Sequence, residues 1–196
     1  MYRKQMTLQK LLCFAAIAAS AIMFLYALGL MTDLYDSLYY TMMDPNNPKD
    51  TWVTGSWIYY DMQPFNRTLL SVSIMMILLS CLLFITGTHK RRRYYAGNAL
   101  STFAFVAAGA VSSVWCHQQV TLYREQFLQV NFDELEFFAD LMKTSYTTST
   151  FWFDVHYAVL ALIAIVCAAL IANFIWKHSL MRAEKKLIDA GREAAK

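Results

Sequence analysis

Four long stretches without a single charged residue constrain the fold of this chain more than any other feature. They are about 17 to 22 residues long and run from Leu11 to Met31, Leu69 to Gly87, Ala99 to Trp115 and Val155 to Trp176. A helix of that length crosses about 30 Å of hydrocarbon. Because backbone amides in lipid must be satisfied within their own segment, we expect each stretch to be a transmembrane helix.

The composition supports this interpretation, because 58% of the 196 residues are hydrophobic and only 16% are charged. A soluble domain of this length carries more charged surface. The sequence therefore predicts an all-α integral membrane protein, a four-transmembrane-helix bundle with two extracytoplasmic loops, the second containing a short amphipathic helix. The predicted segments are a cytoplasmic N-terminus at 1–10, membrane helices at 11–31, 69–87, 99–117 and 151–176, outer loops at 32–68 and 118–150 with the amphipathic helix at about 132–143, a cytoplasmic loop at 88–98 and a cytoplasmic tail at 177–196.

The first apolar stretch follows a basic start, MYRKQMTLQK, and contains the small-residue sequence AIAASA. Both features are typical of a cleaved signal peptide. The apolar region of a signal peptide is about 7–15 residues long, however, and this stretch is longer. We therefore expect an uncleaved membrane helix.

Basic residues predict how the chain is oriented in the membrane. Of the 17 Lys and Arg residues, three lie before the first apolar stretch, four between the second and third, and six after the fourth. The positive-inside rule then places both termini in the cytoplasm, most simply at the plasma membrane. By the same rule, four residues of the cytoplasmic loop are expected to fix the topology and to contact lipid: Lys90, Arg91, Arg92 and Arg93.

Clusters of basic residues also occur in nucleic-acid-binding proteins. Here they lie directly beside apolar helices, where they hold the topology and contact anionic lipid headgroups. The expected partner of these side chains is the bilayer, and no nucleic acid is expected.

Small residues recur at helical spacing in two of the predicted membrane helices. Such stripes allow helices to approach closely in lipid, where no hydrophobic drive brings them together. We expect these residues to face other helices: Ala104, Ala108 and Ser112 in the third helix, and Ala164, Ala168 and Ala172 in the fourth.

The third helix also permits an alternative, because its hydroxyl side chains are suited to lining a pore in an oligomeric channel. These residues are Ser101, Thr102, Ser112 and Ser113. No Asp, Glu, Lys or Arg lies in the middle of any predicted helix, which argues against an ion-coupled transporter.

The outer loops are rich in aromatic and acidic residues. Aromatic residues near membrane ends commonly form an interfacial belt, but they are also typical of protein-binding surfaces. The second loop contains NFDELEFFADLMK, in which Asn131 and Glu134 match a capping box and the apolar residues share one helical face. The predicted interaction surface comprises Tyr39, Tyr40, Trp52, Trp57, Tyr59, Tyr60, Asp133, Glu134 and Glu136. A short hairpin is also possible where TWV and SWIYY flank Thr54 and Gly55.

Four-span proteins with two outer loops include claudins, tetraspanins and connexins, which depend on paired cysteines in their loops. Both long loops here lack cysteine, and all four cysteines lie within or at the ends of the apolar stretches. The sequence therefore assigns the chain to none of these families. The absence of loop disulfides is compatible with a bacterial envelope.

The histidines lie at the ends of the predicted membrane helices, His117 and His156 at one boundary and His89 and His178 at the other. Such pairs could hold haem in a four-helix bundle. Cys116, His117, Asp154 and His156 could instead hold one metal ion. Haem ligands usually lie deeper in a dry core, so no cofactor is expected, and haem or a metal remains the alternative.

Asp154 and His156 lie two residues apart at the start of the fourth apolar stretch. Tyr157 is nineteen residues before Trp176, about 28 Å at the helical rise. Asp154 and His156 are therefore expected in the outer headgroup zone, marking the membrane edge and joining the fourth helix to the third through His117.

The sequence contains no nucleophile elbow, phosphate-binding loop or metalloprotease motif, so an enzyme is not expected. The favoured function is a membrane interaction subunit that presents an aromatic and acidic outer cap to another membrane chain or to a copy of itself. The alternatives are an oligomeric channel or transport component lined by the third helix, and a haem- or metal-binding redox subunit that uses His117 and His156.

Overall fold

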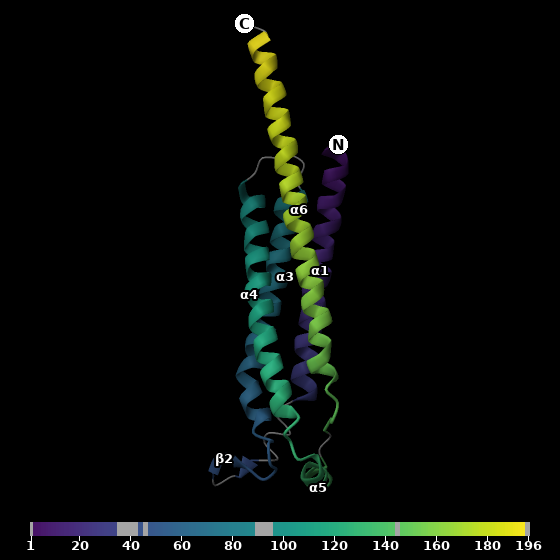
Figure 1. The fold of residues 1–196 in the computed structure, drawn as a ribbon, viewed down its shortest axis with the longest axis vertical. Helices are drawn as coiled ribbons and strands as arrows, with labels where there is room; N and C mark the ends of the chain where they lie inside the picture. The colour runs from purple at the N-terminus through teal and green to yellow at the C-terminus, as the bar shows by residue number, and fades with distance from the viewer. Residues whose placement is uncertain (1, 35–42, 45–46, 89–95, 144–145, 195–196) are drawn as a thin grey trace. The chain divides into compact units, whose positions relative to one another are not determined.

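The computed structural model describes residues 2–34, 43–44, 47–88, 96–143 and 146–194 (Figure 1). Four long helices dominate it: α1 (Tyr2–Asp33), α3 (Ile58–Thr88), α4 (Ala96–Phe127) and α6 (Phe151–Ala194). A shorter helix, α5 (Phe132–Met142), and a hairpin of β1 (Met43–Asp44) and β2 (Asn47–Thr51) complete the described elements. The four long helices are each long and apolar enough to cross a membrane.

Each of the four helices is longer than its uncharged stretch. α1 begins at Tyr2 rather than at 11, α3 begins at Ile58 rather than at 69, and α6 continues to Ala194. Hydropathy marks only the part of a helix that is suited to lipid, and helical hydrogen bonding continues through polar residues on either side. The all-helical fold with four long apolar helices therefore agrees with the prediction at the level of elements.

The chain divides into two compact units, and every long helix contributes to both. The first unit consists of Met1–Ser20, Met76–Ala110 and Leu162–Lys196. The second consists of Ala21–Met75 and Val111–Ala161.

The first unit packs parts of α1, α3, α4 and α6 around a core that contains both apolar and polar side chains. Its apolar part includes Ala16, Leu83, Phe105 and Leu170, which are all buried. Hydroxyl groups bridge the helices, since Thr86 and Ser101 lie 2.6 Å apart and Ser20 donates to the Met76 carbonyl at 3.3 Å. Close approach also depends on Gly109, where an added methyl group would press against Cys167 and Ile163.

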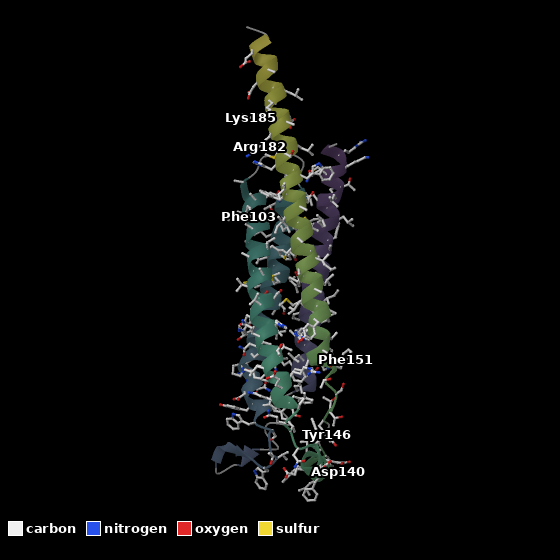
Figure 2. The ribbon with its side chains drawn as sticks, viewed as in Figure 1. Phe103, Asp140, Tyr146, Phe151, Arg182 and Lys185 are labelled. Atoms are coloured by element: carbon white, nitrogen blue, oxygen red, sulfur yellow. The ribbon has the colours of Figure 1, made fainter. Side chains whose placement is uncertain are left out.

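The last part of α6 extends past the other helices of the first unit (Figure 1). Its side chains are mostly exposed, and Arg182 and Lys185 project from it (Figure 2). Residues 180 to 194 include charged side chains such as Arg182, Lys185 and Asp189, which the uncharged part of α6 lacks.

The second unit contains the other parts of the four long helices together with α5 and the hairpin. Aromatic rings fill its core, and Phe65 lies between Trp115 and Tyr123, with ring centroids 5.1 and 5.4 Å away. The Tyr123 hydroxyl donates to the Asp61 carbonyl at 3.0 Å, which ties α4 to α3. α5 buries Leu135 and Ala139 and exposes its acidic side chains.

The hairpin of the first loop lies earlier than the sequence suggested. β1 and β2 pair antiparallel with Met43 opposite Thr51, whereas the segment around Gly55 forms a turn that leads into α3. Gly55 has a φ of +82°, and a Cβ at this position would lie 2.7 Å from the Gln129 carbonyl oxygen. This turn therefore depends on glycine for both its conformation and its contact with the second loop.

The small-residue stripes of α4 and α6 differ in how far their side chains are buried. On α4, Ser112 is buried, and Ala104 and Ala108 are half-buried. On α6, the predicted packing residues Ala164, Ala168 and Ala172 are exposed on the outside of their own chain. The buried face of this part of α6 carries Ile163, Val166, Cys167, Leu170 and Asn173 instead. Apolar residues surround a membrane helix on all sides, so the positions of its alanines alone do not identify the packed face.

Gly29 of α1 lies against the indole ring of Trp152 in α6, and a Cβ at Gly29 would overlap that ring. Gly29→Ala should therefore destabilise the protein in detergent by about 1–3 kcal/mol through overpacking, although alanine is the better helix former. Gly191→Ala is the matched control, because nothing lies within 4 Å of that position. It should leave stability unchanged or raise it by up to about 1 kcal/mol. Thermal unfolding of both variants measures the difference, and equal effects would contradict the close contact of α1 with α6.

Candidate functional site

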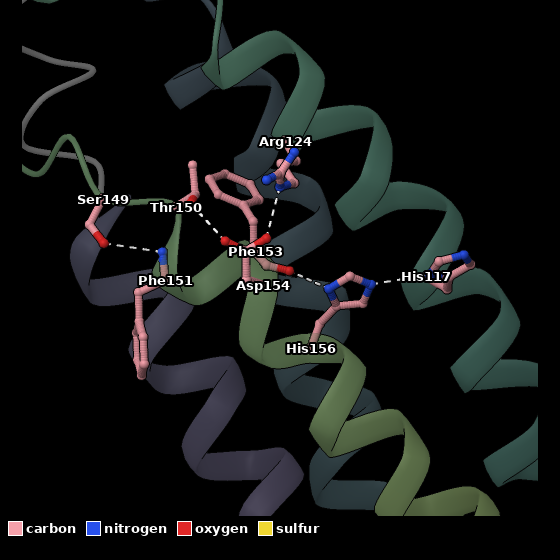
Figure 3. Close-up of polar contacts among 8 residues, drawn as sticks. All are labelled: His117, Arg124, Ser149, Thr150, Phe151, Phe153, Asp154 and His156. Carbon is pink, nitrogen blue, oxygen red and sulfur yellow. Dashed lines mark hydrogen bonds and ion pairs between the residues drawn. The ribbon is translucent and has the colours of Figure 1, made fainter.

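A pair of histidines links α4 and α6 in the second unit. Nδ1 of His117 lies 3.1 Å from Nε2 of His156, and the two rings stack with their centroids 5.4 Å apart (Figure 3). The His156 side chain is fully buried, whereas His117 is exposed on α4. Tyr157 also contacts both imidazoles, with ring centroids 5.6 Å from His117 and 4.0 Å from His156.

The hydrogen bonds determine the tautomers of a neutral pair. Nδ1 of His156 contacts the Phe153 carbonyl oxygen, which can only accept, so the proton of His156 is on Nδ1. Its Nε2 is then an acceptor, and His117 donates from Nδ1. Both nitrogens of the buried ring thus have protein partners, which is the arrangement expected of a structural polar contact between membrane helices.

Asp154 belongs to a separate contact on the outside of α6. Nε of Arg124 donates to Oδ1 of Asp154 at 2.9 Å, and the Thr150 hydroxyl donates to Oδ2 at 2.7 Å (Figure 3). Asp154 lies in the first turn of α6, where the helix dipole favours an anion. The carboxylate and the buried imidazole therefore have different partners, although they are two residues apart.

The predicted metal ligands do not form one site. Cys116 is fully buried, His156 pairs with His117, and Asp154 pairs with Arg124. Across residues 2–34, 43–44, 47–88, 96–143 and 146–194, no group of three or more His, Cys, Asp or Glu side chains could hold a metal ion. All four cysteines are free thiols.

The two loops join in the second unit to form a cap of residues 47–57 and 128–143, which we call the outer cap after the side of the membrane that the sequence predicts for it. The amide of Asn131 donates to the Thr54 carbonyl at 2.9 Å, and the amide of Thr54 donates to a Glu134 carboxylate oxygen at 3.1 Å. The Trp52 ring packs edge-on against Phe138 with centroids 5.8 Å apart. These contacts make the cap a folded element rather than two independent loops.

α5 begins at an N-capping residue, Asn131. The Asn131 side chain accepts a hydrogen bond from the Glu134 amide, and Asp133 and Glu134 lie in the first turn. Lys143 ends the helix in the left-handed conformation, with its amide bonded to carbonyls of the last turn. Desolvation and then the nearby carboxylates of Glu136 and Asp140 raise the pKa of Tyr146 above its ordinary value. Figure 2 labels Asp140 and Tyr146 at this end of the second unit.

The predicted interaction residues are divided between the surface and the interior. Trp52 and Tyr60 are exposed, as are the three acidic residues Asp133, Glu134 and Glu136. Trp57 is half-buried, and its ring packs at a tilt against Tyr60 with centroids 4.7 Å apart, whereas Tyr59 is fully buried. Tyr39, Tyr40, Lys90, Arg91, Arg92 and Arg93 lie outside the described residues.

A second polar cluster, in the first unit, was not predicted from the sequence. It contains a lysine whose side chain is only 5% exposed, and we call it the lysine layer. Its members come from α1, α4 and α6 and are Gln5, Gln9, Asn98, Asn173 and Lys177.

Hydrogen bonds connect the lysine layer in two groups. Gln5 donates to Asn173 at 3.3 Å, and Asn173 donates to Gln9. Separately, Nζ of Lys177 donates to Oδ1 of Asn98 at 2.7 Å. Sequence signals for this layer existed, because Gln5 and Gln9 are four residues apart, as are Asn173 and Lys177, and each pair therefore shares a helical face.

No family model, no curated protein and no solved structure matches this chain. The interpretation of both polar sites therefore depends on their geometry alone.

The bond between His117 and His156 can be tested with a double-mutant cycle. His156→Leu should destabilise the protein by about 1–3 kcal/mol, because it leaves His117 Nδ1 without its partner. The double variant with His117→Leu should recover part of that loss, giving a coupling energy of about 0.5–1.5 kcal/mol. Unfolding in detergent measures all four proteins. His178→Leu, an exposed histidine on the same helix, is the control, and additive effects would contradict the bond.

Proposed function

We propose that this chain is an integral membrane interaction subunit whose outer cap binds a second membrane protein. The proposed orientation places both termini in the cytoplasm and the cap outside, most simply at the plasma membrane, as the basic residues predict. The observation that carries the proposal is the surface of the cap. Phe137, Leu141 and Trp52 are 67%, 64% and 55% exposed on an otherwise folded element.

Large exposed apolar side chains surrounded by polar ones are typical of protein-binding surfaces. Phe137 and Leu141 are four residues apart on α5 and so share one face, separate from the buried Leu135 and Ala139. The first loop adds Trp52 to the same cap through Phe138. Both loops therefore contribute to one contiguous candidate surface.

Charge favours a different chain over a second copy as the partner. α5 carries Asp133, Glu134, Glu136 and Asp140, and Lys143 follows it. Two such surfaces facing each other would bring like charges together, which is unfavourable at an interface. A partner with basic side chains around an apolar patch would complement the cap.

The two alternatives receive less support from the described contacts. A channel lined by α4 needs hydroxyls that face water, but Ser101 bonds Thr86, and the Thr102 hydroxyl donates to the Asn98 carbonyl at 2.7 Å. A haem or metal at His117 and His156 needs free ring nitrogens on both residues, whereas both nitrogens of His156 contact protein atoms. The proposed subunit function needs neither a pore nor a cofactor.

Cysteine accessibility tests the proposed orientation. In a background with Cys81→Ser, which removes the exposed native cysteine, Thr148→Cys should react with an impermeant maleimide on intact cells. Ala190→Cys should react only after permeabilisation, because the tail is expected in the cytoplasm. Gel shift of the labelled protein reads both outcomes. If only Ala190→Cys is labelled on intact cells, the true topology is the inverse of the proposed one.

Native purification with mass spectrometry tests the cap as a binding surface. The wild type should carry a second membrane chain at fixed stoichiometry, and the double change Phe137→Asp with Leu141→Asp should release it. Truncating central anchors of this kind typically costs 2 kcal/mol or more, about a thirtyfold loss of affinity. The purified partner should bind again to the wild type, and more weakly as salt rises.

Leu187→Asp is the matched control, because Leu187 is exposed but lies on the tail of α6. It should retain the partner. Loss of the partner in all variants would assign the interaction to another surface. A homo-oligomer of the wild type that survives the changes at Phe137 and Leu141 would overturn the proposal.

A further inference from the structure

The lysine layer contains a cation without a counter-charge. The Lys177 side chain is 5% exposed and donates to the neutral amide oxygen of Asn98 at 2.7 Å. In the part of the chain that the structure describes, Lys177 makes no ion pair. A buried charge is costly unless an opposite charge accompanies it, so the layer is incomplete as an electrostatic unit.

The helix beside Lys177 adds to the local positive potential. Asn98 lies in the first turn of α4, which begins at Ala96 and has no acidic residue in that turn. The N-terminus of a helix carries a partial positive charge and unpaired amide groups, which favour an anion. The lysine is therefore at the end of α4 where a cation is least favourable.

Asn98 also has unused hydrogen-bonding capacity. Its Nδ2 is buried without a partner, and the residue is only 3% exposed. The residue is held in place, because its backbone carbonyl accepts the hydroxyls of Ser101 at 3.2 Å and Thr102 at 2.7 Å. An unpaired buried amide donor beside an unpaired cation points to an acceptor that carries negative charge.

The backbone of α3 allows this arrangement through a glycine. A Cβ at Gly87 would lie 3.0 Å from Nδ2 of Asn98 and 2.8 Å from Nε2 of Gln9. Two amide donors thus approach the same position on α3, and Lys177 is bonded to one of the two amides. Gln9 Nε2 bonds only the weak acceptor Sγ of Cys13, at 3.5 Å, so neither of these two donors has a strong acceptor. The unpaired acceptor of the layer is Oε1 of Gln5, which belongs to the other hydrogen-bonded group.

We propose that Lys177 and Asn98 bind a phosphate oxyanion. One phosphate oxygen would accept from the remaining N–H groups of Lys177 and from Nδ2 of Asn98, which supplies the missing charge and the missing acceptor together. The group can come from an anionic phospholipid headgroup or from inorganic phosphate, since both present the same oxygens. The proposal uses residues of the first unit only and does not depend on the function proposed for the outer cap.

Thermal unfolding in a neutral detergent distinguishes the two sources. Short-chain phosphatidylglycerol, matched phosphatidylcholine, inorganic phosphate and chloride at equal ionic strength are added separately to the wild type. A rise in Tm with phosphatidylglycerol alone identifies a lipid headgroup, and a rise with inorganic phosphate identifies free phosphate. If neither raises the Tm above the level in chloride, the proposal is wrong.

Lys177→Met tests the residue itself. Affinity for the active probe should fall about 10- to 100-fold, the loss expected for one hydrogen bond to a charged group. Without the probe, Lys177→Met should be at least as stable as the wild type, because an uncompensated buried charge has been removed. Lys185→Met, which changes an exposed lysine on the same helix, should respond to the probe as the wild type does.

Asn98→Asp provides a second variant that does not depend on tolerance of Lys177→Met. The new carboxylate would lie beside Lys177, serve as an internal counter-ion and remove the unpaired amide donor. The probe-free Tm should rise, and the response to the probe should disappear. A probe response unchanged in Lys177→Met, or in Asn98→Asp if Lys177→Met does not fold, would overturn the assignment.

Discussion

One constraint accounts for the four long apolar helices, the need to satisfy backbone hydrogen bonds in the lipid where these helices are predicted to lie. Each long helix meets it internally, so its outer surface can consist of any apolar side chain. Association of such helices then gains little from burying apolar surface, because lipid is as apolar as leucine. Contacts that lipid cannot replace become decisive, and both units contain them. They are close approach at Gly29 and Gly109, hydroxyl bridges such as Thr86 with Ser101, and the imidazole contact of His117 with His156.

This constraint also explains how far the sequence could predict the fold. Long uncharged stretches identified the four helices, because nothing else in a protein needs about 20 apolar residues in a row. Hydropathy could not show that α1 begins at Tyr2, because it does not detect helical turns outside the apolar part. The residues of α6 that its own chain buries could not be identified from the sequence, for a related reason. A soluble helix reveals its buried face by contrast with a polar one, but both Ala168 and the buried Leu170 lie in an entirely apolar segment.

The polar sites were predictable to different degrees. His117 and His156 were expected at one boundary of neighbouring helices, and the structure brings their rings into contact. Asp154 and His156 are about 200° apart around a helix, so their separation into an exposed ion pair and a buried bond follows from the helical repeat. Lys177 was counted as part of the basic tail, because a sequence cannot tell a lysine that extends towards water from one that turns into the bundle. Only the i, i+4 partners Gln5 with Gln9 and Asn173 with Lys177 could have indicated a polar interior.

The histidine pair and the lysine layer lead to different conclusions, because all donors of the buried ring have acceptors in the first and some donors lack them in the second. In the histidine pair each donor of the buried ring has an acceptor, and the groups can all be neutral, so nothing further is needed to explain why the site is stable. In the lysine layer Nδ2 of Asn98 has no acceptor, and Lys177 has no opposite charge within the described residues. A satisfied network specifies which helices pair, whereas an unsatisfied one with net charge requires something from outside the chain. The distinction between a structural polar contact and a binding site in this protein therefore depends on whether its charge and its hydrogen bonds balance.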